Sequence, residues 1–464
     1  MWMFSQYINH RGGDFQQLLA SEASLPASPF SSIISSSSSS ARLFHPPFSG
    51  RTMATEVLNH LRTLLVVLLL LVSCVFGDAV KRADAERKAE KGSNTISSKR
   101  RVKRPPKQCR FPAIYNFGDS NSDTGGISAV FYPITMPYGQ TYYGKAVGRA
   151  SDGRLMVDFF AEHLGLPHLS AYLNSVGANY HHGANFATGS ATIRMPNKPF
   201  LQGGRSPFNL QIQVAQIMQF KERVLDPGTE SSARLPKPET FPKGLYMIDI
   251  GQNDLADLLK DMDFTMDYKM AIPAIRILIG QLAYQIQNLH FQGGRAFWVH
   301  NTGPIGCLPY TLTWVHKPPP PGYLDEHGCI KEQNELAKEF NRQLKDEIMS
   351  LRQNLSDATI IYVDVYAAKY GLISDAKNQG FGPPAEICCG YYKSDIRVTC
   401  GNWQKINGTD IYGPPCANPS SLISWDGVHY TEAANNWLAT RILYGTFSDP
   451  PIPMTQACHR QQKT

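Results

Sequence analysis

The sequence FPAIYNFGDSNSDTGG, residues 111–126, joins a short apolar run to a polar turn that is rich in glycine. The apolar part, Ala113–Phe117, is too short for a helix and is typical of a buried β-strand. Three further runs of this kind are Leu245–Ile250, Ala296–His300 and Thr359–Val365. The segments between them carry apolar residues at helical spacing, as in Ile275–Leu289 and Leu336–Leu351. Strands that alternate with long helices predict a mainly parallel sheet covered by helices, the α/β class.

This α/β pattern starts near residue 108 and ends near residue 458, which leaves residues 459–464 as a short tail. Before it, residues 78–107 are charged and poor in apolar side chains, which predicts a basic disordered linker. Lys and Arg exceed Asp and Glu by seven in this linker, which equals the net charge of +7 of the whole chain. The predicted domain is therefore neutral overall, which argues against nucleic acid as a partner. Residues 101–104 are either a site for a processing protease or simply basic linker.

The first 77 residues contain an apolar run of 13 residues, Leu64–Phe76, which follows Arg62. A signal-peptide core has roughly 7–15 apolar residues, whereas a transmembrane helix needs roughly 20. We therefore expect residues 1–77 to be an N-terminal extension with a signal peptide, and the mature protein to be secreted. Because the run lies far from Met1, we expect Met53 to be the working start. An uncleaved membrane anchor is the alternative interpretation.

Cysteine usage agrees with export, because eight of the nine cysteines lie outside that run. An even number of cysteines in an exported chain indicates disulfides and leaves the pairing open. The segment Cys388–Cys416 is rich in Gly, Asn and Pro, which predicts a loop held by cysteines. No repeated C-x-x-C pattern supports a zinc site. Asn354 and Asn407 begin glycosylation patterns, which predict two surface loops.

Ser120 comes directly after the first predicted strand, behind Gly118. Open α/β sheets bind ligands at the carboxyl ends of their strands, where a glycine turn can present a serine to the crevice. The alternative is that Ser120, Ser122 and Asp123 only cap a helix and fill a turn. Asp123–Gly125 matches the D-T-G motif of aspartic proteases, but the second such motif that their mechanism needs is missing. The G-x-S-x-G elbow of α/β-hydrolases is also missing around Ser120.

A serine hydroxyl needs a base to act as a nucleophile. Asp426 and His429 are three residues apart, so one turn can place the carboxylate against the imidazole. Asn253 follows a predicted strand and can aim its amide into the crevice, and Gly189 offers a backbone N–H that no side chain would block. Taken singly, each segment has a plainer interpretation. The Asp–His pair can equally lie on the surface or bind a metal. Asn253 alone is more often a turn residue, and Gly189 alone is more often an ordinary loop glycine.

Together these segments resemble the GDSL family of serine esterases and lipases, the SGNH hydrolases, and in particular its plant branch. The resemblance extends from about Cys109 to Cys458 and implies one three-layer α/β/α domain with helices on both faces of the sheet. It also implies Ser120 as nucleophile, His429 as base and Asp426 as the partner of His429.

The same resemblance implies three oxyanion donors, namely Ser120, Gly189 and Asn253. One departure is Asn121, which stands where the leucine of the family's name would be. This position carries no proposed chemistry, and GDSNSDTGG, residues 118–126, is similar to the early-nodulin-like and fucosidase-like esterases of plants.

These observations predict a secreted, apoplastic esterase that cleaves carboxylic esters, short-chain or acetyl esters above all, through an acyl-enzyme. The substrate would be a small molecule, a lipid or a cell-wall ester, with no metal, no cofactor and no stable membrane insertion after signal cleavage. Three alternatives stay open. An acyltransferase would use the same residues, and the chain could be a non-catalytic secreted glycoprotein. A glycosidase, such as an α-fucosidase, would normally need two carboxylates beside the sugar bond.

Overall fold

The computed structural model describes residues 108–458, except for 199, 201–203, 227, 229–232, 262–266, 316–318 and 394–395. The expected signal peptide, with Leu64–Phe76 and the start at Met53, lies outside the described residues. So do the basic linker, residues 78–107, and the tail, residues 459–464. None of the helices in the described part of the chain is long and apolar enough to cross a membrane.

A six-stranded sheet forms the centre of the domain, in the order β10-β5-β4-β3-β1-β2. Its strands are β1 (Ile114–Gly118), β2 (Gly183–Asn185), β3 (Leu245–Asp249), β4 (Ala296–His300), β5 (Thr359–Val363) and β10 (Ser448–Asp449). Strands β1 to β5 pair in parallel, and β10 pairs with the edge of β5 in the antiparallel direction. The four predicted strands are confirmed to within two residues at each end. Strands β2 and β10 were not predicted, because two or three residues carry no periodic signal.

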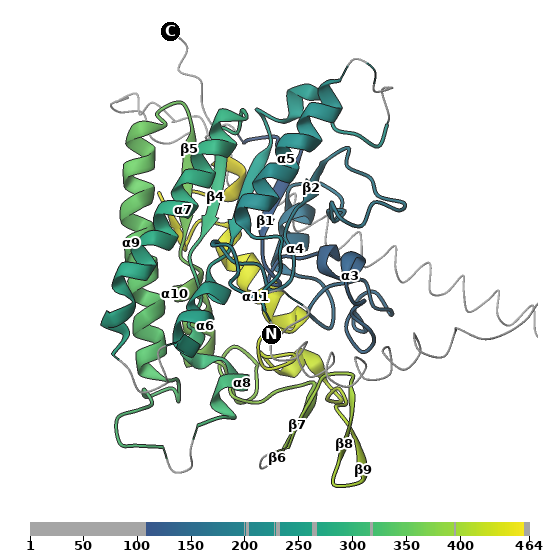
Figure 1. Ribbon diagram of the computed structural model, residues 1–464, viewed down its shortest axis with the longest axis vertical. Coiled ribbons are helices and arrows are strands. Elements are labelled where there is room, and N and C mark those ends of the chain that lie inside the picture. Colours follow the sequence, from purple (N-terminus) through teal and green to yellow (C-terminus); the bar gives the residue numbers. More distant parts are fainter. Residues whose placement is uncertain are drawn as a thin grey trace, which may run out of the picture. The chain divides into compact units, whose positions relative to one another are not determined.

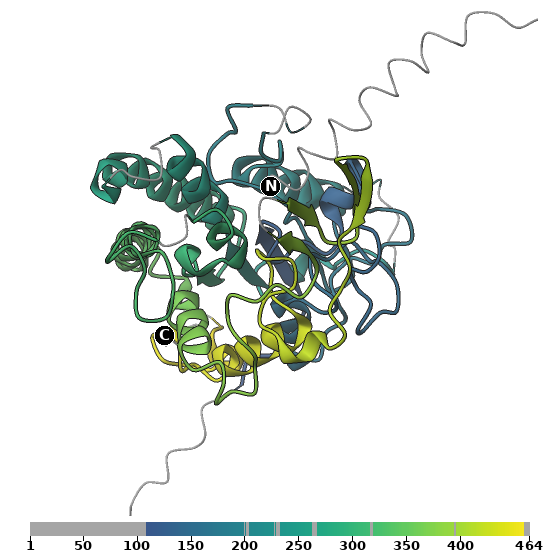
Figure 2. The same cartoon turned by 90° about the horizontal axis from the view of Figure 1, so that it is seen from below.

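Helices cover both faces of this sheet (Figure 1 and Figure 2). One face carries α5 (Leu210–Leu225), α7 (Ile272–Phe291) and α9 (Lys331–Asn354). The other carries α4 (Met156–His163), α10 (Val365–Ser374) and α11 (Glu432–Leu443). Side chains of a strand alternate between its faces: Tyr115 and Phe117 join the first core, and Ile114 joins the second. The predicted three-layer α/β/α domain is confirmed.

Shorter elements lie between these strands and helices along the chain. The helices are α3 (Gly126–Val130), α6 (Gln252–Asp261) and α8 (Pro309–Leu312). The 3-10 helices are η3 (Pro238–Thr240), η4 (Tyr268–Ala271), η5 (Ile305–Cys307), η6 (Pro419–Ser421) and η7 (Met454–Gln456). Two antiparallel hairpins are formed by β6 (Gly390–Lys393) with β7 (Ile396–Thr399), and by β8 (Trp403–Ile406) with β9 (Thr409–Tyr412).

The eight cysteines outside the predicted signal core form four disulfides. The pairs are Cys109–Cys458, Cys307–Cys329, Cys388–Cys416 and Cys389–Cys400. The first pair joins the two ends of the described domain. Two of the others hold the segment 388–416, where the sequence predicts a cysteine-stapled loop and the structure has the two hairpins.

Both predicted glycosylation sites are exposed, but they differ in structure. Asn407 lies in the two-residue turn between β8 and β9, with φ of 50° beside Gly408, as a tight hairpin requires. Asn354 is the last residue of α9, so the prediction of a surface loop is wrong at that position. The apolar face of α9 continues to Leu351, which extends the helix up to the pattern.

Candidate active site

The loop that follows β1, residues 119–125, is called here the β1 loop. It begins beside the end of β3, where a Cβ on Gly118 would collide with the carbonyl oxygen of Asp249. Asp119 then shapes the loop, because its carbonyl accepts the backbone N–H groups of Ser122 and Asp123 and its Oδ1 accepts the N–H of Asn121. This tight turn leaves Ser120 partly exposed at the carboxyl end of the sheet, as the sequence predicts.

Ser120, His429 and Asp426 form a continuous hydrogen-bonded row. Ser120 Oγ lies 2.8 Å from His429 Nε2, and His429 Nδ1 lies 2.7 Å from Asp426 Oδ2. The two segments are 309 residues apart in sequence. The second one precedes α11, whose N-cap Thr431 accepts the N–H of Ala434 and fixes where the helix begins. The predicted Asp–His turn is therefore present, and the fold places it against the β1 loop.

Asp426 is fully buried and accepts four hydrogen bonds. Its Oδ1 accepts the backbone N–H groups of Val428 and His429, at 2.9 and 2.8 Å, and Tyr138 Oη donates to Oδ2 at 3.0 Å. Burial acts to raise the pKa of Asp426, but His429 and the backbone donors outweigh it and lower the pKa below its usual value. An ionised Asp426 fixes Nδ1 of His429 as the proton donor, which leaves Nε2 free to accept the proton of Ser120.

The structure corrects the expectation of a free backbone N–H at Gly189. This N–H donates to Asp123 Oδ2 at 2.7 Å. The same carboxylate accepts the N–H groups of Gly125, Gly126 and Ile127, so it caps α3 and ties the β1 loop to the loop that contains Gly189. The expectation that no side chain would block this N–H is therefore wrong, because a carboxylate 66 residues away in the sequence accepts it.

The next residue, Ser190, has a left-handed backbone with φ of 67°. Among the described residues, no hydrogen bond uses the backbone N–H of Ser190 or that of Ser120. Non-glycine residues rarely adopt this conformation, and such strain gathers at functional sites. Three and four residues further on, the N–H groups of Ile193 and Arg194 donate to Asp254, which holds this loop from α6.

Asn253 lies in the first turn of α6, directly beyond β3 as predicted. Its Nδ2 donates to the carbonyl oxygen of Ala191 at 2.9 Å and to Asp119 Oδ2 at 3.1 Å. Its Oδ1 accepts a hydrogen bond from Arg205 Nη1 at 2.7 Å. The amide therefore lies between Ala191 and the β1 loop, and its NH₂ group already has two acceptors.

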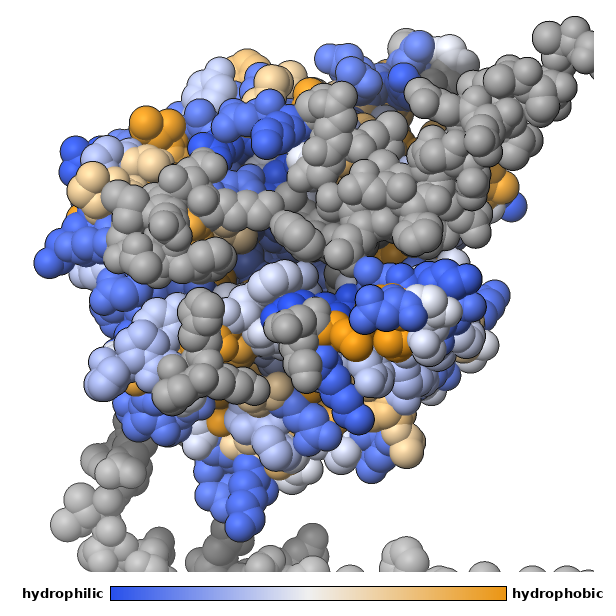
Figure 3. All heavy atoms as spheres, turned by 60° about the horizontal axis from the view of Figure 1, so that its bottom comes forward, coloured by the Kyte–Doolittle hydropathy of each residue, from blue (hydrophilic) through white to orange (hydrophobic). Residues whose placement is uncertain are grey.

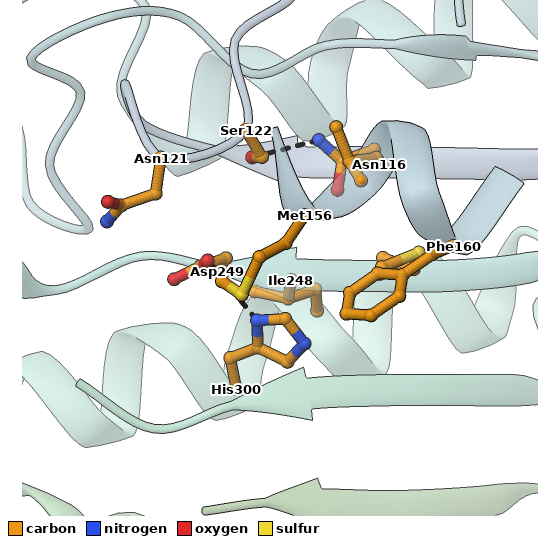
Figure 4. Close-up of a pocket in the computed structure, with 10 residues that line it drawn as sticks. Asn116, Asn121, Ser122, Met156, Phe160, Ile248, Asp249 and His300 are labelled. Atoms are coloured by element: carbon orange, nitrogen blue, oxygen red, sulfur yellow. Dashed lines mark hydrogen bonds and ion pairs between the residues drawn. The ribbon is translucent and has the colours of Figure 1, made fainter. Parts of the chain in front are cut away.

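A buried cluster of Asp119, Asp249, His300 and Lys369 lies beneath the β1 loop. Figure 4 shows the side chains that line a small cavity there, with His300 Nδ1 at 3.2 Å from Asp249 Oδ2. Burial, together with the charge of Asp249, raises the pKa of Asp119 to about 7. Burial also acts to raise the pKa of Asp249, but the contact with His300 outweighs it and lowers that pKa. Burial lowers the pKa of Lys369.

Sequence reasoning missed this cluster, although Asp249 and His300 are the last residues of β3 and β4 and a search of strand ends would have found them. It also missed Tyr138, Arg205 and Ser190, whose contacts depend on the fold alone. In the described part of the chain, no group of three or more His, Cys, Asp or Glu side chains is arranged to hold a metal ion.

Residues 114–442 match the family model of the GDSL-like lipases and acylhydrolases. The chain belongs to this family. A GDSL esterase/lipase of Arabidopsis thaliana is 54% identical over 76% of this chain and 91% of its own length. The GDSL esterase/lipase ENOD8 of Medicago truncatula is 44% identical over 76% of this chain and 92% of its own. A protein named α-L-fucosidase 3, from Arabidopsis thaliana, is 44% identical over 76% and 94%. The resemblance to this plant branch is confirmed, and the chain is a carboxylic ester hydrolase of the GDSL esterase/lipase type.

Proposed function

We propose that this GDSL hydrolase is a secreted esterase that cleaves short-chain carboxylic esters through an acyl-enzyme on Ser120. The observation that carries the proposal is the row from Ser120 Oγ to His429 and Asp426, with contacts of 2.8 and 2.7 Å. A buried, ionised carboxylate, an imidazole with a fixed proton and a partly exposed hydroxyl are the groups that acyl transfer requires.

In the first step His429 Nε2 accepts the hydroxyl proton while Ser120 Oγ attacks the carbonyl carbon of the ester. The C=O bond becomes a single bond to an oxyanion. When the carbonyl re-forms, the bond to the alcohol oxygen breaks, and the proton on His429 passes to that oxygen. A water molecule then attacks the acyl-enzyme in the same way, and the carboxylic acid and the Ser120 hydroxyl are released.

Three hydrogen-bond donors, one of them the backbone N–H of Ser120 itself, suit the oxyanion. The backbone N–H groups of Ser120 and Ser190 have no acceptor among the described residues, and Ser190 replaces Gly189 in this role. The third donor is Asn253, whose second N–H moves from Asp119 to the oxyanion. Donors that strengthen their contact only as the charge develops lower the barrier without holding the substrate back.

The surface around the site supports a small ester as substrate. Figure 3 looks toward this end of the domain, and in its coloured part small apolar areas alternate with hydrophilic ones. The exposed ring of Trp314 has the guanidinium of Arg397 over it, 3.8 Å from the ring centroid. Docking on a lipid aggregate would favour a larger continuous apolar area. Four disulfides and two exposed sequons support secretion.

The fucosidase name of one relative raises a glycosidase as the second candidate. Glycosidases place two carboxyl groups on either side of the scissile bond. Beside Ser120, Asp426 and Asp119 are buried and committed to protein partners, and Asp249 faces His300. None of these three can flank a sugar without losing those contacts, so the serine mechanism is favoured.

The test compares the mature protein with its Ser120→Ala variant on nitrophenyl acetate, butyrate, a long-chain ester and nitrophenyl fucoside. We expect turnover of acetate and butyrate to exceed that of the long-chain ester, and to fall by on the order of 10⁴- to 10⁶-fold in the variant. Full ester turnover without Ser120 would sink the mechanism. Cleavage of the fucoside with no ester turnover would establish the glycosidase instead. Transfer of the acetyl group to an added alcohol in preference to water would indicate an acyltransferase. If the folded protein turns over none of them, the non-catalytic alternative is supported.

A further inference from the structure

The orientation of the Asn253 amide is fixed by the chemistry of its neighbours. A guanidinium has only hydrogen-bond donors, so the amide atom that contacts Arg205 is the oxygen. The carbonyl oxygen of Ala191 can only accept, so the amide atom that contacts Ala191, and Asp119 with it, is the NH₂ group. No flipped arrangement of this amide satisfies all three neighbours.

Arg205 is itself held firmly in place. Its side chain is only 4% exposed, and Nη2 and Nε lie 2.6 and 2.8 Å from Asp257 Oδ1. Asp257 is four residues beyond Asn253 on α6, so both project from the same side of the helix. The guanidinium thus bridges the carboxylate of Asp257 and the amide of Asn253 from the loop that precedes α5.

From this bridge we propose that Arg205 is a positioning residue, which acts on the reaction through the amide of Asn253. The inference rests on the proposed esterase function. When the second N–H of Asn253 leaves Asp119 for the oxyanion, the contacts that still hold the amide are Arg205 on Oδ1 and Ala191 on the other N–H. Arg205 keeps the amide from turning, and its charge draws electrons toward Oδ1 and makes the N–H groups better donors. Asp257 keeps the guanidinium in the plane that this contact requires.

The test is a double-mutant cycle with Arg205→Met and Asn253→Ala, measured as kcat and KM on nitrophenyl acetate. For Arg205→Met alone we expect kcat to fall about 10- to 100-fold, less than the ~100- to 1000-fold of a lost oxyanion donor. KM should change by less than about 3-fold, because the lost interaction belongs to the transition state. In the Asn253→Ala background, the same change should lower kcat by no more than about 2-fold. Arg205→Lys should recover part of the rate, since an ammonium can still donate to Oδ1.

Arg352→Met is the matched control. Arg352 also bridges a carboxylate, Asp449, and a backbone carbonyl, but it does so beside β10 at the far edge of the sheet. Its loss should lower the melting temperature and leave kcat unchanged. If Arg205→Met does not fold, Asp257→Asn replaces it in the double-mutant cycle, because this change weakens the same bridge at a partly exposed carboxylate.

An equal loss of kcat from Arg205→Met with and without Asn253 overturns the inference and leaves the esterase function standing. An effect of Arg205→Met on KM alone overturns the inference too. So does an equal fall in kcat in Arg352→Met, when the two variants have the same melting temperature. Ester turnover that does not need Ser120 removes the proposed function, and the inference with it.

Discussion

The two sides of the active site are built in different ways. On the proton-transfer side, Asp426 and His429 belong to one turn, and the row to Ser120 is complete in the free protein. On the oxyanion side, the proposed donors come from three segments: the N–H groups of Ser120 and Ser190 have no acceptor among the described residues, whereas Asn253 already donates to Asp119 of the β1 loop. In the proposed mechanism the first side accepts a proton without any change of partner, whereas on the second side Asn253 exchanges Asp119 for the oxyanion.

This difference shows what each side contributes. A complete row fixes the tautomer of His429 before any ester arrives. On the oxyanion side, the contact with Asp119 satisfies the amide of Asn253 at rest, and the proposed mechanism releases it when the oxyanion forms. Substitutions on the two sides should therefore differ in the size of their effect on kcat and in their pH dependence.

The largest effect should come from Asp426→Asn. The amide cannot stabilise a protonated His429 and permits the wrong tautomer, so we expect kcat to fall by roughly 10³- to 10⁴-fold. Stopped-flow or steady-state assays with nitrophenyl acetate measure it. Asp364→Asn, at the N-cap of α10, is the control for loss of a charged capping group. A fall in kcat below about 10-fold for Asp426→Asn would show that the row is not used.

On the oxyanion side, Asn253→Ala should lower kcat by about 100- to 1000-fold with little change in KM. The reason is that this amide supplies a donor to the transition state and leaves two acceptors, Asp119 and Ala191, unpaired. The measurement is kcat and KM on acetyl and butyryl esters, with thermal unfolding to check the fold. An unchanged kcat would remove Asn253 from the oxyanion site.

A smaller effect is expected for Tyr138→Phe. It removes one of the four donors to Asp426 and keeps the ring, which packs on Trp425. One such hydrogen bond is worth about 1–2 kcal/mol, so kcat should fall about 5- to 30-fold. Tyr392→Phe is the matched control, because its hydroxyl reaches only the backbone carbonyl of Asp426, at 3.4 Å. Equal losses for both variants would contradict a role for the Tyr138 contact.

The smallest effect concerns stability against pH. The pKa of Asp119 is raised to about 7 in the folded chain, so between about pH 4 and 7 the folded state binds more protons than the unfolded state. The free energy of unfolding should therefore fall as pH rises through this window and level off above it. Asp254, whose pKa burial also raises to about 7, adds to the same slope.

Urea titrations at pH 5 and 8 measure that slope, and Asp119→Asn should reduce it. Asp426 and the exposed Asp357 both have lowered pKa values, so their titration lies below about pH 4 and Asp357→Asn should leave the slope unchanged. A slope that Asp119→Asn does not alter would show that Asp119 stays ionised throughout.

Local features of the fold and the site could be predicted from the sequence, whereas contacts between distant segments could not. Apolar runs fixed the long strands and helices, and the spacing of Asp426 and His429 predicted their pairing, because both are local properties. Gly189 was placed in the correct loop, but its amide was expected to be free. Its acceptor, Asp123, is 66 residues away and was interpreted as part of a turn. Arg205 carries no local signal at all, since only the fold brings it to Asn253.

The central claim, that Ser120 is the nucleophile and His429 its base, is tested most directly by covalent labelling. Diisopropyl fluorophosphate forms a phosphorus–oxygen bond with an activated serine and releases fluoride as the hydroxyl proton passes to the base. Peptide mass spectrometry of the labelled mature protein locates the bond. We predict one phosphoryl group per chain, on Ser120, and a labelling rate that falls at least about 100-fold in His429→Ala. A label on another residue, or an unchanged rate without His429, would contradict the account.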